Sequence, residues 1–372
     1  MVSTRTVPLL SHQPLRLLFQ LAYTAGIVAL LPFWIISASI PSLRQNPKWT
    51  AKQSILVRVA YALGDMNSRI RITEPLSLEK GNEGDRFRLI RPSPEDVYKG
   101  PLASEIIKPA TIGGTWFPRA PGGRHLASKL VVLHFHGGAF VKGDGRTEYS
   151  GFPSKLLIER GGVDFVLSVQ YRLSAYGGTN GFPAALQDAL TSYMFLLREL
   201  RIPAHQIVLC GDSAGGNLAV ALLRYIEEFG HDLAIPGPKC VVLLSPWLAP
   251  LDYDVSRNPN HGSDILSTTS LRWGALAYTW RVPDAASHPY ITPLGNPFAT
   301  TVPILINTGT AEVFYSGHLR WASAMRGVGG NMVELHEEDD ACHDTFLLGE
   351  RLGFEESAQS VAARVGEFIR QY

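Results

Sequence analysis

Apolar and polar positions follow two different patterns along this chain, one before residue 42 and one after residue 128. Residues 17–41 carry no charged side chain, and most of them are apolar. After residue 128, short apolar runs typical of buried strands alternate with amphipathic segments of helical period. Strands and helices that alternate in this way predict an α/β fold, a mostly parallel central sheet with helices on both faces.

The individual elements can be placed by residue number. Strands are expected at 130–135, 163–170, 206–210, 240–245, 304–308 and 332–336. Helices are expected at 54–66, 184–200, 217–228, 317–326 and 355–369. The pattern of residues 246–300 is mixed and predicts no single element.

The uncharged stretch 17–41 is long enough to cross a bilayer, because about 20 apolar residues span it as a helix. We therefore expect a single-pass membrane anchor in residues 1–42. Two alternatives stay open. Ser37-Ala38-Ser39 resembles the cleavage site of a signal peptide, and a hairpin of two short helices would lie in the membrane interface or over a substrate pocket. Basic residues flank the stretch on both sides, and their count mildly favours a cytoplasmic domain after it.

Charge and cysteine content exclude several classes of protein. The chain has 34 Lys and Arg against 33 Asp and Glu and a formal net charge of +1, with no basic stripe. Nucleic acid is therefore not an expected partner. Three cysteines without a spacing pattern predict neither a disulfide framework nor a zinc site.

A glycine-rich turn around Ser213 is the strongest chemical signal. The run Gly211-Asp212-Ser213-Ala214-Gly215-Gly216 lies between an expected strand and an expected helix. This arrangement raises a serine hydroxyl above the sheet, next to the positive end of a helix. The glycines remove side chains that would clash in so sharp a turn. Ser213 is the candidate nucleophile, and the alternative is a tight turn in some other α/β protein.

A second glycine motif, His136-Gly137-Gly138-Ala139, follows the strand expected at 130–135. Acyl transfer places negative charge on the former carbonyl oxygen, and each rigid N–H donor aimed at it lowers the barrier by about 3–4 kcal/mol. We expect the N–H groups of Gly137, Gly138 and Ala214 to form this oxyanion hole, with an ordinary glycine turn as the alternative. No further metal-binding side chains accompany the motif, so no metal is expected.

The two motifs resemble the hormone-sensitive-lipase family of α/β-hydrolases. Tyr171-Arg172-Leu173 and Phe182-Pro183-Ala184-Ala185, with Asp188, resemble the segment between them. The resemblance runs from about residue 129 to the C-terminus and departs from the family at Ser174-Ala175-Tyr176. It implies an α/β-hydrolase fold with a helical cap and a serine ester hydrolase that needs no cofactor.

A serine nucleophile needs a base and an acid that orients the base. The family order is serine, acid, histidine, which places the base at His343, with His336 as a less suitable rival. Glu312 falls at the family's acid position, where Asp is usual, and a surface glutamate is the alternative. His318 is expected to be solvated or locally bonded, with no part in the triad.

A membrane anchor before such a domain is similar to the arrangement of arylacetamide deacetylases and steryl acetyl hydrolases. The resemblance implies removal of a short acyl group, an acetyl group first of all, from an apolar alcohol such as a sterol or polycyclic natural product. It also implies an enzyme held at the endoplasmic reticulum with its catalytic domain in the lumen. The basic residues that flank the stretch favour the cytoplasm instead, so the side of the membrane that the domain faces stays open. The expected partner is a small apolar ester.

The expected organisation is an anchor in residues 1–42, a cap with the first sheet strands in 43–127, and the catalytic core in 128–372. An amidase or a hydrolase of a secondary-metabolite pathway is an alternative function. A ligand-binding receptor on a hydrolase scaffold is another, but such receptors lose a triad residue, whereas Ser213 and His343 are both present.

Overall fold

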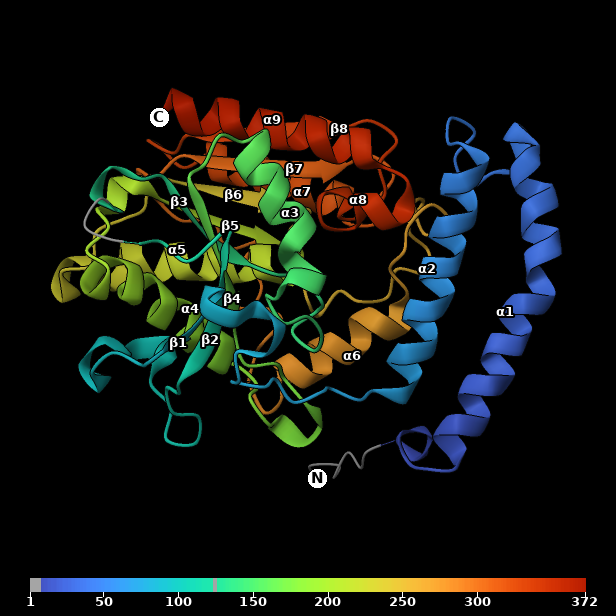
Figure 1. The fold of residues 1–372 in the computed structure, drawn as a ribbon, viewed down its shortest axis with the longest axis horizontal. Coiled ribbons are helices and arrows are strands. Elements are labelled where there is room, and N and C mark those ends of the chain that lie inside the picture. Colours follow the sequence, from blue (N-terminus) through green and yellow to red (C-terminus); the bar gives the residue numbers. More distant parts are fainter. Residues whose placement is uncertain (1–7, 123–125) are drawn as a thin grey trace.

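The computed structural model describes residues 8–122 and 126–372, with an eight-stranded sheet at its centre (Figure 1). The strand order is β1-β2-β4-β3-β5-β6-β7-β8. The strands are β1 (Phe87–Ile90), β2 (Ile112–Phe117), β3 (Val131–Phe135), β4 (Phe165–Gln170), β5 (Ile207–Asp212), β6 (Cys240–Leu244), β7 (Ile304–Gly309) and β8 (Val333–Glu338). Only the pairs β1/β2 and β2/β4 are antiparallel among these strands. The prediction of a mostly parallel sheet is confirmed.

The sheet separates two apolar cores, because successive side chains of a strand point to opposite faces. In β5, for example, Leu209 packs in one core and Val208 in the other. The first core contains side chains of α4 (Ala184–Met194), α5 (Ala214–Leu233) and α7 (Tyr315–Arg326), and the second contains side chains of α3 (Thr147–Glu159) and α9 (Glu355–Gln371). Burial on both faces explains why the strands read as continuous apolar runs.

The sequence pattern did not predict three of the α-helices in the described residues: α3, α6 (Thr268–Tyr278) and α8 (Thr345–Leu352). The helix α6 lies in the region 246–300 and begins at a capping box made by Ser267 and Ser270. Its many small and hydroxyl residues hide the helical period. The helix expected at 184–200 ends as α4 at Met194 and continues as a short π-helical turn, Phe195–Glu199.

The N-terminal segment forms two packed helices, α1 (Leu15–Ser39) and α2 (Ala51–Ile70), and Figure 1 shows α2 between α1 and the body. α1 continues through Pro32 as one helix, so two short helices do not form there. In the described residues it is the one helix long and apolar enough to cross a membrane. Its apolar side chains are largely exposed, unlike those of a core helix. α2 begins at a capping box of Thr50 and Gln53 and also packs on α6 and α8.

Candidate active site

Ser213 lies in the sharp turn between β5 and α5. Its backbone has φ +49° and ψ −115°, a conformation that is costly for a residue with a side chain. A Cβ atom on Gly215 would lie 1.9 Å from the carbonyl oxygen of Phe135, and one on Gly211 would lie 2.2 Å from that of Gly215. The expected steric reason for these glycines is therefore present in the structure.

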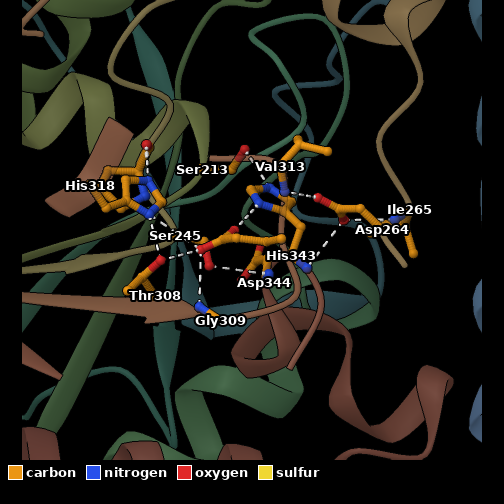
Figure 2. A network of polar contacts seen from close by, with 12 residues as sticks. Ser213, Ser245, Asp264, Ile265, Thr308, Gly309, Val313, His318, His343 and Asp344 are labelled. Carbon is orange, nitrogen blue, oxygen red and sulfur yellow. Dashed lines mark hydrogen bonds and ion pairs between the residues drawn. The ribbon is translucent and has the colours of Figure 1, made fainter. Parts of the chain in front are cut away.

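The structure brings Ser213, His343 and Glu312 together from three separate segments, and Figure 2 shows Ser213 beside His343. Nε2 of His343 lies 3.0 Å from Oγ of Ser213, and Nδ1 lies 2.7 Å from Oε2 of Glu312. Ser213 follows β5, Glu312 follows β7 and His343 follows β8, so all three stand at the carboxyl ends of parallel strands. Ligands bind at this edge in open α/β sheets.

The hydrogen bonds assign the tautomer of His343. A carboxylate only accepts, so Nδ1 carries the proton donated to Glu312, and in the neutral ring Nε2 accepts from the serine hydroxyl. Burial lowers the pKa of His343, but the hydrogen bond and charge of Glu312, together with Asp264 and Asp344, outweigh burial and raise it to about 9. The arrangement can withdraw a proton from Ser213 and stabilise the resulting imidazolium.

In the glycine loop after β3, Gly137 does not have the position expected of an oxyanion-hole donor. Its N–H group already donates to Oδ2 of Asp212 at 2.5 Å, so it does not point to a substrate oxygen. Among the described residues, the N–H groups of Gly138 and Ala139 have no acceptor. Ala214 is the first residue of α5, where an N–H group has no acceptor within the helix. The free donors are those of Gly138, Ala139 and Ala214.

Asp212 joins the glycine loop to the nucleophile turn. Besides Gly137, it contacts Nε2 of His134 at 2.9 Å and forms a side-chain hydrogen bond with Asp344. Burial, with the neighbouring charge of Asp212, raises the pKa of Asp344 well above its usual range. The structural role expected of Asp212 therefore consists of holding three segments at one carboxylate.

Asp264, which the sequence did not single out, ties the acid loop to the histidine loop. One oxygen accepts from the backbone N–H of Val313 at 2.6 Å, and the other accepts from the N–H groups of Ile265 and His343. Burial raises the pKa of Asp264 to about 6. Its position in a loop between β6 and α6 gives no local signal, because its partners lie 49 and 79 residues further along the chain.

Two further residues contact the other oxygen of Glu312. Oε1 accepts from the Thr308 hydroxyl at 2.7 Å and from the N–H of Gly309 at 3.0 Å. His318 lies behind Thr308 and is 1% exposed. His318 is therefore locally bonded rather than solvated, and it belongs to the surroundings of the acid. No local motif connects His318 with Glu312 in the sequence.

Two cavities lie near this site. One of about 680 Å³ adjoins the loop after β3 and is lined by Val141, Lys142 and Trp273, with side chains of α1 and α2. Burial lowers the pKa of Lys142 to about 8. The other, of about 530 Å³, lies between α1 and α2 and reaches His261 and Asp264.

Known proteins share both the sequence pattern and the fold. Residues 132–347 match the sequence family described as having the alpha/beta hydrolase fold. An acetyl-hydrolase of Streptomyces hygroscopicus is 31% identical over 244 residues, which cover 65% of this chain and 72% of that protein. Arylacetamide deacetylase-like 2 of Homo sapiens is 29% identical over 199 residues, 49% of this chain and 46% of the human protein.

A crystal structure of an esterase from the bacterial hormone-sensitive lipase family superimposes with a TM-score of 0.63 at 22% identity, covering 87% of this chain and 98% of that one. The chain belongs to the α/β-hydrolase fold family. Within that family it is an esterase-type enzyme, and it shares its fold with the esterase of the hormone-sensitive lipase family.

Proposed function

We propose that this protein is a membrane-anchored serine esterase that removes a short acyl group, acetyl first of all, from an apolar alcohol. The observation that carries the proposal is the unbroken chain of contacts from Ser213 through His343 to Glu312. A ligand-binding receptor would have no need for a serine hydroxyl 3.0 Å from a histidine ring nitrogen whose ring is oriented by a buried carboxylate.

In the proposed mechanism, Oγ of Ser213 attacks the ester carbonyl carbon while its proton passes to Nε2 of His343. The oxyanion accepts from the N–H groups of Gly138, Ala139 and Ala214, and Glu312 stabilises the imidazolium. His343 then protonates the leaving alcohol as its C–O bond breaks. Water then attacks the acyl carbon while His343 takes its proton, the bond from that carbon to Oγ of Ser213 breaks, and the carboxylic acid leaves as His343 returns the proton to Oγ.

The choice of an acetyl ester is supported by the names of two relatives, an acetyl-hydrolase and an arylacetamide deacetylase-like protein. The choice of an apolar alcohol is supported by the cavity between α1 and α2. Ile27 and Leu30 of α1 line it together with Val57 and Ala62 of α2. Since α1 also has the length and composition of a membrane span, a substrate dissolved in the bilayer would reach this cavity from the lipid. A sterol or polycyclic acetate has a suitable apolar body.

The central test uses the full chain in detergent with p-nitrophenyl acetate, butyrate and decanoate. We expect turnover that declines with acyl length and falls at least 10³-fold in Ser213→Ala. Ser323→Ala, on the exposed face of α7, is the matched control. Activity retained in Ser213→Ala would exclude this serine as the nucleophile.

Two glycines in the wall of the second cavity allow a test of the apolar alcohol. Gly26 and Gly262 line the cavity, and a Cβ atom on either meets nothing within 4 Å, so leucine at these positions adds bulk to the cavity wall with no clash at its Cβ. If two methylene contacts of the substrate are displaced, about 1.6 kcal/mol is lost, which is roughly tenfold in kcat/KM. We expect this loss for the acetate of a sterol and an unchanged rate for p-nitrophenyl acetate. Gly329→Leu, also at an open position, is the control, and equal effects on both esters would refute the cavity's role.

A further inference from the structure

His318 is a buried histidine whose two ring nitrogens are both engaged. Nε2 lies 2.7 Å from the carbonyl oxygen of Pro246, and Nδ1 lies 2.7 Å from Oγ1 of Thr308. The same Oγ1 lies 2.7 Å from Oε1 of Glu312. Figure 2 shows the ring of His318 next to Thr308 and well apart from the ring of His343. A second histidine thus reaches the acid from the side opposite to His343.

Counting protons decides the state of this ring. The carbonyl oxygen of Pro246 only accepts, so Nε2 of His318 carries a proton. Thr308 has one hydroxyl proton, yet its oxygen lies at hydrogen-bond distance from two groups. If Nδ1 were bare, it and the Glu312 carboxylate would compete for that proton, and one 2.7 Å contact would join two lone pairs.

A proton on Nδ1 gives every polar atom in the hydrogen-bonded series from Pro246 to Glu312 a suitable partner. Nδ1–H then donates to the Thr308 oxygen, and the Thr308 hydroxyl donates to Oε1 of Glu312. The imidazolium also lies 3.3 Å from Oε1, at ion-pair distance. Buried charges are stable when they are paired and hydrogen-bonded in this way.

We propose that His318 is an imidazolium at neutral pH and acts as a positioning residue that holds Glu312 and limits the basicity of His343. This role rests on the proposed function, in which His343 is the base. The carboxylate lies between two histidines, and the positive charge of His318 offsets part of the attraction that Glu312 exerts on a proton at His343.

The charged surroundings of His318 fit a cation. Glu312 faces it across Thr308, with His343 behind that carboxylate. On its outer side a small cavity of about 90 Å³ is also lined by Asp252, Asp254 and Arg320. The negative groups outnumber the positive ones. Burial would raise the pKa of Glu312, but the charges and hydrogen bonds of the two histidines bring it well below its usual range, so Glu312 is the ionised partner.

The kinetic test compares wild type with His318→Gln, in which a neutral amide retains a donor for the Pro246 carbonyl. Removing the positive charge raises the pKa of His343, so the acidic limb of the kcat/KM profile for p-nitrophenyl acetate should move upward by roughly one pH unit. KM should change little. Thr308→Val, which breaks the link but keeps the cation, should lower kcat with a smaller shift of the limb. A limb that stays in place in a folded His318→Gln protein would refute the charge on His318.

A second measurement does not depend on activity or on any substitution of His318. Long-range ¹H–¹⁵N spectra of ¹⁵N-histidine-labelled Ser213→Ala protein report which ring nitrogens are protonated. We expect the His318 ring to show two protonated nitrogens at pH 7. One protonated and one bare nitrogen would overturn the proposal, whereas absent esterase activity in the wild type would refute the proposed function and leave this result standing.

Discussion

Replacing Glu312 by Gln is the sharpest test of the acid, because the change keeps the side-chain volume and replaces a charged group that only accepts by a neutral amide that also donates. Glu312 is fully buried, and both of its oxygens accept. The amide oxygen of Gln must remain beside the N–H of Gly309, since an NH₂ group there would face a donor at 3.0 Å. The NH₂ group is then directed at Nδ1 of His343.

This orientation reverses the tautomer of His343. Nδ1 must accept from the amide, so Nε2 carries the proton and presents a donor to Ser213. A base in the wrong tautomer costs about 10⁴-fold in kcat, equivalent to about 5.4 kcal/mol of barrier. The assay is kcat for p-nitrophenyl acetate, with circular dichroism to verify folding.

Glu350→Gln, on the exposed surface of α8, controls for the loss of a carboxylate. Its kcat should equal that of wild type. If folded Glu312→Gln retained kcat within tenfold of wild type, Glu312 would not be the group that orients His343, and the acid would have to be sought elsewhere.

Four more outcomes follow from the structure. Asp264→Asn, which places an NH₂ group beside backbone donors, should lower the free energy of unfolding in urea by about 2–4 kcal/mol; an unchanged midpoint would contradict the bridging role. Because the base must be unprotonated, kcat/KM should rise with pH up to about 9, the pKa of His343, and a plateau already at pH 6 would contradict that value. As this pKa exceeds the ordinary 6.5, the contribution of His343 to stability, complete below 6.5, should be lost between pH 6.5 and 9 in denaturant titrations at stepped pH. Gly215→Ala should fail to accumulate as folded protein, given a contact of 1.9 Å to Phe135, and normal solubility would refute the steric argument.

The sequence predicted those features that depend on neighbours in the chain. The turn around Ser213 is a local strand–glycine–helix pattern, and the order of Ser213, Glu312 and His343 comes with the family motif. The strands were visible because burial on both faces makes them continuous apolar runs. The helix α6 was missed, since serine, threonine and glycine residues mask its period.

Features that depend on distant partners were not predictable. Gly137 was expected to donate to a substrate, but its acceptor is a carboxylate 75 residues later. No motif marks Asp264 or His318. Their contacts around the triad form only when the segments that follow β6, β7 and β8 come together in the fold. Geometry at the edge of the sheet, not local composition, sets the environment of the acid.

The carboxylate of Asp212 has a consequence for engineering. Since it fastens Gly137, His134 and Asp344 next to the nucleophile, the loop that would cradle a transition state cannot be exchanged alone with that of another esterase. A chimera that imports the loop after β3 without compatible groups at these positions would leave a buried charge without partners and lose its alignment with the serine. Redesign of selectivity would do better to start at the helices over the sheet, which share none of these bonds.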